Sequence, residues 1–166
     1  MRGARKGGMT VEVALWLPVL FLLIGGLIQF GKITYIYYSL QKTMHTAASY
    51  LAVQSGVNFC PDASDPTIAA AIEFAITGAT DGGGTAAITG LTSDMIAVTT
   101  QCIDPVTQTL GDCAVSGCGA PAGAQRPDFL TVTIPNGYMI QPRIPYLLVD
   151  PIPLKPKAVV AYQGGS

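Results

Sequence analysis

The pattern of hydrophobic and polar positions divides the chain into an early apolar run and a longer mixed region. From Val13 to Phe30 no side chain is charged, and Gln29 is the only polar one. About 18–20 helical residues cross the ~30 Å hydrocarbon layer of a bilayer. A core helix would keep a polar stripe, and the hydrophobic core of a signal peptide is only about 7–15 residues long. The pattern therefore predicts a retained membrane-spanning helix.

Beyond this run the same helix is predicted to continue as an amphipathic stalk, from about Val11 to Val53 in all. Apolar residues recur there at spacings of three and four, which places them on one helix face: Ile33, Tyr37, Leu40, Met44, Ala47 and Leu51. Ser55-Gly56 can end the helix. Pro18 removes a backbone hydrogen bond, so we expect a kink or local melting near Ala14.

The remaining residues predict a small mixed domain. A short helix is expected from Ile68 to about Ile76, with Asp65 as N-cap and Pro66 at the first position. Gly78–Gly90 reads as a glycine-rich loop, and 114–127 as a second loop. Strands are expected at Met95–Ile103, Asp128–Ile134 and Lys157–Gln163, with turns at Asp104-Pro105, Gly111-Asp112 and Pro135-Asn136-Gly137, and an irregular or edge-like segment at Pro142–Pro156.

These elements define an α+β fold class. We expect a long N-terminal transmembrane helix that continues as an amphipathic stalk, followed by a small exported antiparallel-sheet domain with a short helix. About 110 residues follow the long helix, enough for one modest domain.

The charge distribution predicts the orientation of the span. Arg2, Arg5 and Lys6 precede it, so the positive-inside rule keeps the N-terminus cytoplasmic and exports the chain beyond about residue 31. The formal net charge of −1 argues against a nucleic-acid surface. Three tyrosines follow where the helix would leave the bilayer, a position that suits interfacial anchoring or helix packing: Tyr35, Tyr37 and Tyr38.

Four cysteines lie on the predicted exported side, and an even number in an oxidising compartment predicts disulfides. They are Cys60, Cys102, Cys113 and Cys118. Three connectivities are possible. We favour Cys113–Cys118 or Cys102–Cys113 as a local loop, with Cys60 taking a partner across the domain. The spacings are not those of a zinc site, and no histidine lies near them, so we expect no metal.

Candidate catalytic groups do not converge, and we expect neither enzymatic activity nor a cofactor. The single histidine, His45, falls in the middle of the stalk. The pairs Asp62/Asp65 and Asp104/Asp112 fall in turn-rich segments, where aspartate caps backbone groups. Asp81-Gly82-Gly83-Gly84 lacks the lysine of a phosphate loop and the pattern of a calcium loop.

Glu12 is the exception, because a carboxylate at the start of a membrane span is costly unless a cation neutralises it. If the chain were cut after Gly7, the new α-amine would stand on Gly8 and Glu12 would be the fifth residue. That α-amine, from the same or a neighbouring subunit, could neutralise the carboxylate. The alternative is that Glu12 is simply solvated in the headgroup zone.

The segment from Gly7 to Ile24 resembles the N-terminus of TadE-like pseudopilins of the Tad (Flp) pilus system, a branch of the type IV pili. The resemblance lies in Gly7-Gly8-Met9-Thr10-Val11-Glu12-Val13-Ala14-Leu15, then Leu17-Pro18, then an apolar stretch to Phe30-Gly31. It extends to Ala47-Ala48-Ser49-Tyr50-Leu51-Ala52, although the basic residue usual before the alanines is absent. The resemblance covers about residues 5–53.

The resemblance implies a minor pilin that assists the assembly of pili used in adhesion and biofilm formation. It implies cleavage by a prepilin peptidase at Gly7/Gly8, with Glu12 needed for processing or assembly, although a cut at Gly8/Met9 would place Glu12 fourth. The domains are then a leader at 1–7, the transmembrane and stalk helix at 8–53, and an exported disulfide-bearing head at 54–166. Losing the leader leaves six basic against ten acidic residues, a formal charge of −4.

The implied partners are the inner membrane, the prepilin peptidase, other pilins and the Tad assembly machinery, without nucleic acid. The implied location is the bacterial inner membrane, single-pass, with the C-terminal domain periplasmic or extracellular. The alternative hypothesis is an unprocessed, membrane-anchored extracytoplasmic binding module. A secreted enzyme is a third possibility, which would need a cluster of titratable groups.

Overall fold

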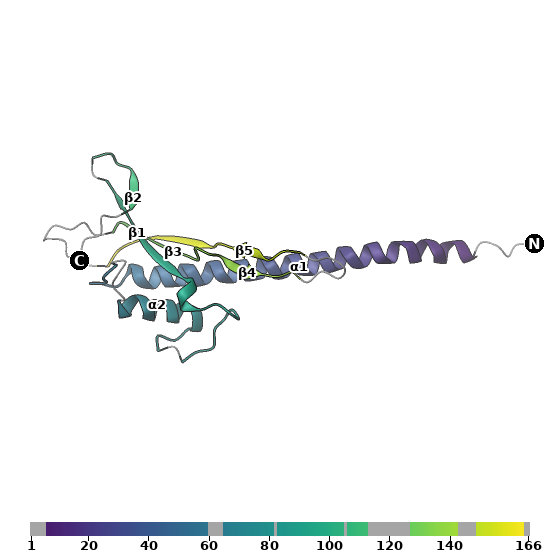
Figure 1. Cartoon of the computed structure of the whole chain (residues 1–166), viewed down its shortest axis with the longest axis horizontal. Coiled ribbons are helices and arrows are strands. Elements are labelled where there is room, and N and C mark those ends of the chain that lie inside the picture. Colours follow the sequence, from purple (N-terminus) through teal and green to yellow (C-terminus); the bar gives the residue numbers. More distant parts are fainter. Residues whose placement is uncertain are drawn as a thin grey trace, which may run out of the picture.

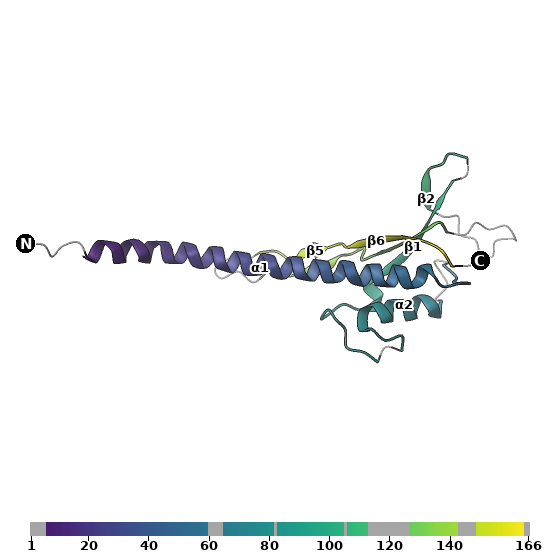
Figure 2. The same ribbon diagram turned by 180° about the vertical axis from the view of Figure 1, so that it is seen from behind.

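The computed structural model describes residues 6–59, 65–81, 83–104, 106–112, 127–142 and 149–164. One helix, α1 (Lys6–Ala52), runs along most of the molecule, and the other elements gather beside its C-terminal half, with β2 projecting away from it (Figures 1 and 2). This arrangement confirms the predicted α+β class, with a long apolar N-terminal helix followed by a small antiparallel-sheet domain with a short helix. We call the part of the chain packed on α1 the head.

The second helix, α2 (Pro66–Thr77), begins and ends at residues that carry local start and stop signals. Asp65 accepts a hydrogen bond at its Oδ1 from the backbone N–H of Thr67, at 2.7 Å, and Pro66 occupies the first turn, where its missing N–H is not needed. Gly78 ends the helix with a φ of 79°, a left-handed conformation that glycine adopts without strain.

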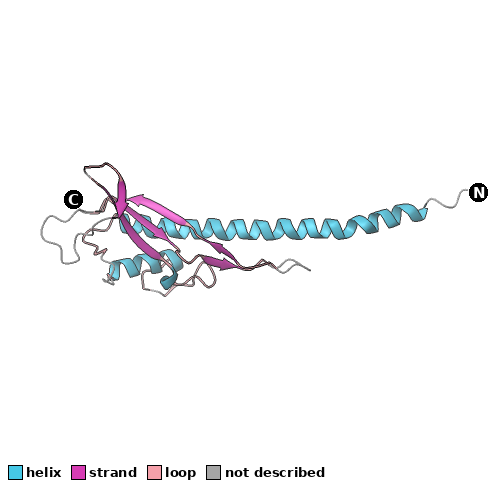
Figure 3. Ribbon diagram, turned by 45° about the horizontal axis from the view of Figure 1, so that its top comes forward, coloured by secondary structure: helices cyan, strands magenta, loops and turns pink. Residues whose placement is uncertain are grey.

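The head contains two antiparallel sheets, seen separately in Figure 3. Four strands form the main sheet in the order β2–β1–β3–β6, and a separate two-stranded ribbon pairs β4 with β5. The strands are β1 (Ala97–Ile103), β2 (Leu110–Asp112), β3 (Phe129–Thr133), β4 (Tyr138–Ile140), β5 (Ile152–Leu154) and β6 (Lys157–Ala161), and a short 3₁₀ turn, η1 (Ser93–Met95), precedes β1.

The strand register places one apolar side of the main sheet against the helices. Val98 pairs with Val132, which pairs with Ala158, so all three side chains share a sheet face. That face packs on Leu40 and Met44 of α1, both fully buried, together with the apolar face of α2. Alanines at the tightest points of α1 let the backbones approach: Ala47, Ala48 and Ala52.

One edge strand of the sheet, β6, is fixed to α1 at its start and just beyond its end. The Nε2 of Gln41 donates to the carbonyl of Lys157 at 2.7 Å, and the N–H of Gln163 donates to the carbonyl of Ala52 at 2.8 Å. The first bond occupies a carbonyl of β6 that could otherwise recruit another strand. The second gives the last turn of α1 a backbone partner.

Three sequence expectations are wrong in detail. Residues 111–112 form part of β2 instead of a turn, because the chain has already reversed between Asp104 and Thr109, whose backbones hydrogen-bond at 3.0 Å. Met95 lies in η1 and not in a strand. Tyr37 is 45 % exposed, because the core stripe of α1 continues from Leu40 to Ile36, one turn away, instead.

The cap of α2 gives a test of local stability. Backbone N–H donors, first that of Asn58 and then that of Thr67, hold the pKa of Asp65 below its ordinary value of 3.8. A lowered folded-state pKa contributes stability above the ordinary value, and this is lost as the pH falls through the folded value. Asp65→Ala should therefore lower the unfolding free energy by about 1 kcal/mol at pH 7, and by less below pH 3.8.

Thermal unfolding of the full chain in detergent, at pH 7 and at a pH below 3.8, would measure this effect. Asp94→Ala is the matched control, since Asp94 is exposed and lies within the short η1, where it caps no α-helix. Equal midpoints for Asp65→Ala and wild type at pH 7 would show that the cap contributes nothing.

Candidate functional site: the bare half of the long helix

The N-terminal half of α1 is an uncovered apolar surface. Every side chain from Thr10 to Ile24 is exposed, and none of the most apolar 18-residue stretch is buried. Fully covering one large apolar side chain is worth roughly 1.5–3 kcal/mol, so this surface strongly favours an apolar environment. The helix is long and apolar enough to cross a membrane once.

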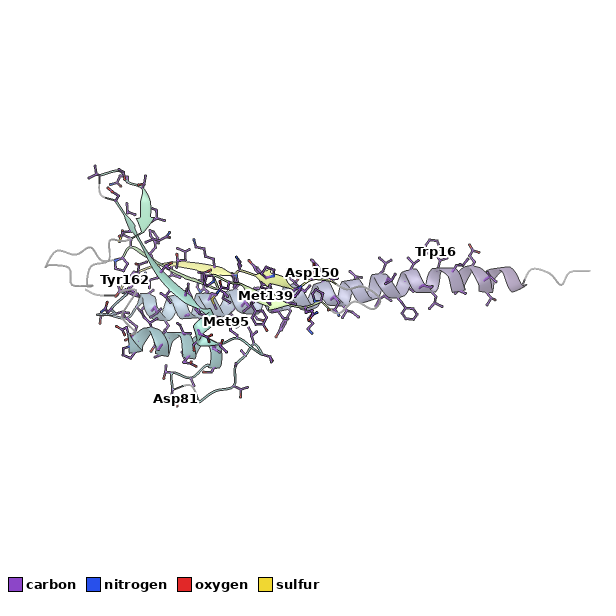
Figure 4. All side chains as sticks on the ribbon, viewed as in Figure 1. Trp16, Asp81, Met95, Met139, Asp150 and Tyr162 are labelled. Atoms are coloured by element: carbon purple, nitrogen blue, oxygen red, sulfur yellow. The ribbon has the colours of Figure 1, made fainter. Side chains whose placement is uncertain are left out.

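The head begins where this bare surface ends. Phe30 is still 70 % exposed, whereas Ile33 and Ile36 are half-buried and Leu40 is fully buried. The bare stretch from Thr10 to Phe30 is about 30 Å long at ~1.5 Å per residue, the thickness of a hydrocarbon layer. Figure 4 shows the same division, with Trp16 on the free part of the helix and the other labelled residues on the head.

Glu12 lies on this bare surface near the start of α1. Since α1 begins at Lys6, Gly8 and Glu12 are one helical turn apart on the same face, and Trp16 follows one turn later. Glu12, Trp16 and Leu20 border a shallow groove along the helix. The structure thus groups the carboxylate with the predicted new N-terminus, Gly8, on one side of the helix; their roles in cleavage and assembly stay predictions.

Pro18 lies inside α1, and the helix is continuous around it from Lys6 to Ala52. Local melting near Ala14 is therefore not present in the structure, and the alternative expectation, a kink, stays a prediction. Pro18 has no N–H to donate to the carbonyl of Ala14, and hydrating such a carbonyl costs least near the end of a membrane span.

Other candidate groups have local structural partners. Asp104 Oδ1 accepts from the backbone N–H groups of Thr107 and Val106, which hold the pKa of this carboxyl below its ordinary range and shape the β1–β2 turn. Nδ1 of His45 lies 3.2 Å from Oγ of Ser49 on the exposed side of α1. Within the described ranges, His, Cys, Asp and Glu side chains form no group of three that could hold a metal.

The cysteines are placed only in part. Cys102 is buried in β1 and disulfide-bonded. Cys60, Cys113 and Cys118 lie outside the described residues, as does Asp62, so the connectivity stays a prediction. Gly7 lies within α1, and cleavage after this residue stays a prediction.

The fold and the bare surface define a protein with one N-terminal membrane-length helix and a small α+β head wrapped on its distal half. Residues 7–49 match the family model described as TadE-like protein. The chain therefore carries a TadE-like segment, which covers nearly all of α1 and none of the later helices and strands. No curated protein and no solved structure matches the chain.

Proposed function

We propose that this chain is a pseudopilin, a minor pilin that acts in the assembly of Tad (Flp) pili for adhesion and biofilm formation. The observation that carries the proposal is the bare half of α1, an apolar surface of membrane length with a single carboxylate, Glu12, inside a TadE-like segment. Such a helix can be stored in a bilayer and later packed against other helices of the same kind. Nothing in this role requires catalysis or a cofactor.

The proposed maturation step is cleavage between Gly7 and Gly8 by a prepilin peptidase. Cleavage removes the basic residues that hold the N-terminus at the cytoplasmic face and creates an α-amine one helical turn from Glu12. The amine and the carboxylate neutralise each other, within one subunit or between neighbours, which lowers the cost of moving Glu12 into an apolar bundle.

The proposed location is the bacterial inner membrane, single-pass, with the N-terminus cytoplasmic and the head periplasmic or extracellular. The bare helix supports the anchoring, and the three basic residues before it support the orientation. The proposed partners are the peptidase, other pilins and the Tad assembly machinery.

The mass of the N-terminal peptide tests the proposal. The protein would be extracted from membranes of cells with and without the prepilin peptidase. We expect a start at Gly8 only when the peptidase is present. A start at Met1 in both strains would contradict the proposal and would favour the alternative, an unprocessed membrane-anchored module whose head binds a ligand.

A further inference from the structure

The β4–β5 ribbon stands apart from the main sheet and lies closest to the bare half of α1. In Figures 1 and 3 the ribbon extends along α1 towards its N-terminus, beyond the four-stranded sheet. In Figure 4, Asp150 and Met139 are the labelled head residues nearest the side of Trp16, whereas Tyr162 lies at the opposite end.

One face of the ribbon packs on the core of the head, at the end of the head nearest the bare helix. Tyr138 and Leu154, which pair across the ribbon, pack on the same core cluster as Ile36 of α1. Ile36 lies about 9 Å along the helix from Phe30, the last residue of the bare stretch. Figure 1 shows the ribbon between the four-stranded sheet and this bare stretch.

The ribbon's other face is apolar and uncovered. Met139 is 61 % exposed and pairs with Pro153, which is also exposed, and these two side chains share the face opposite Tyr138 and Leu154. A face like this, placed directly beside a membrane-length helix, continues the same apolar surface. Pro151 and Pro153 carry no backbone N–H, which reduces the donors that would need a partner at a lipid boundary.

The ribbon is also held firmly enough to act as a fixed support. The hydroxyl of Tyr138 donates to the carbonyl of Thr89 in the segment after α2. Gly137 turns into β4 with a φ of 78°, and a β-carbon there would collide with Pro153. Asp150 is exposed at the same end of the ribbon. Because a carboxylate favours the headgroup layer over hydrocarbon, Asp150 limits how deeply this end could enter a bilayer.

We propose that the β4–β5 ribbon is a second membrane contact, which rests Met139 and Pro153 on the headgroup–acyl boundary of the bilayer that α1 spans. Together with Tyr35, exposed about 8 Å beyond Phe30, it gives the head two points of support and fixes its tilt on the membrane. This inference rests on the proposed anchoring of α1. It goes beyond that proposal by assigning a lipid-binding surface to the head.

Tryptophan fluorescence of the full chain in lipid vesicles tests the proposal, because Trp16 is the only tryptophan. The probe variants are Met139→Trp and Pro153→Trp, each combined with Trp16→Phe. Val106→Trp in the same background is the matched control, since Val106 is 88 % exposed on the β1–β2 hairpin. Phospholipids brominated at shallow or deep acyl positions act as quenchers.

We expect the ribbon probes to show blue-shifted emission that is lost most strongly with shallow bromines, while Val106→Trp emits as in water and is not quenched. The two ribbon variants are independent, so one that fails to fold leaves the other to decide. Water-like emission from the folded ribbon probes would overturn the inference. A blue shift without quenching would overturn it too, since protein would then cover the ribbon.

The wild-type chain separates failure of this inference from failure of the anchoring on which it rests. Trp16 should be quenched by bromines if α1 spans the bilayer. If Trp16 is quenched and the ribbon probes are not, only the ribbon contact is wrong. If Trp16 is not quenched, the proposed anchoring fails first.

Discussion

Replacing Glu12 by alanine is expected to reduce pilus assembly by about tenfold to a hundredfold while the head stays folded. The reason is the geometry of α1, which places this carboxylate one turn from Gly8 in an otherwise apolar surface. A hydrogen-bonded charge pair there would contribute roughly 1.5–3 kcal/mol, which corresponds to that change in an association equilibrium. Pili on the cell surface, counted by electron microscopy and by immunoblot of sheared fibres, provide the measurement.

Two further variants make this result specific. Thr10→Ala changes a neighbouring exposed residue on the same helix and should leave pili at the wild-type level. Glu12→Gln keeps the size and removes the charge, so it should behave like alanine. The mass of the N-terminal peptide in each strain separates a failure of cleavage from a failure of assembly. Normal pili with Glu12→Ala would remove the central role of this residue.

Much of the long helix could be predicted because its signals are local. A run without charges from Val13 to Phe30 indicates a span at any position in a chain, and the three-and-four spacing of Leu40, Met44 and Ala47 indicates the buried face. The helix α2 could be predicted for the same reason, since Asp65 and Pro66 act within one turn.

The short strands could not be predicted because their reasons are not local. β2 and β4 have three residues each, and both exist only through a partner strand that stabilises them. β4 follows the turn at Gly137 and pairs with β5, inside the proline-rich segment expected to be irregular or edge-like; the edge-like alternative is confirmed there. The ribbon, and with it the proposed lipid contact, therefore became visible only in three dimensions.

The candidate site, like the fold, could be predicted only in part. The sequence identifies Glu12 as an unusual residue, because its cost depends only on its neighbours along the chain. It does not show that the bare surface stops where the head starts, because that boundary depends on which residues of the head reach Ile36. Tyr37, the residue of α1 that the sequence pattern wrongly places in the core, lies near this boundary.

Met44→Asp is expected to unfold the head without releasing the protein from the membrane. Met44 lies on α1 and is fully buried in the core that α1 forms with α2 and the main sheet. An aspartate there leaves a cavity and an unpaired carboxylate, which together should cost more than about 4 kcal/mol. That is a large part of the roughly 5–15 kcal/mol that stabilises a typical domain. Limited proteolysis of the full chain in detergent, with membrane fractionation of the cells, measures both effects.

His45→Asp is the matched control, because His45 is the next residue along α1 and is exposed. This change loses only the exposed contact with Ser49 and should alter the stability by no more than about 0.5 kcal/mol. Equal protease resistance of Met44→Asp and His45→Asp would show that α1 is not the core of the head. The expected difference follows from one feature, that a single helix forms the anchor with its first half and the core of the head with its second. Damage to the core should therefore leave a tethered but unfolded head, a state that a head with its own separate core could not reach through a change in α1.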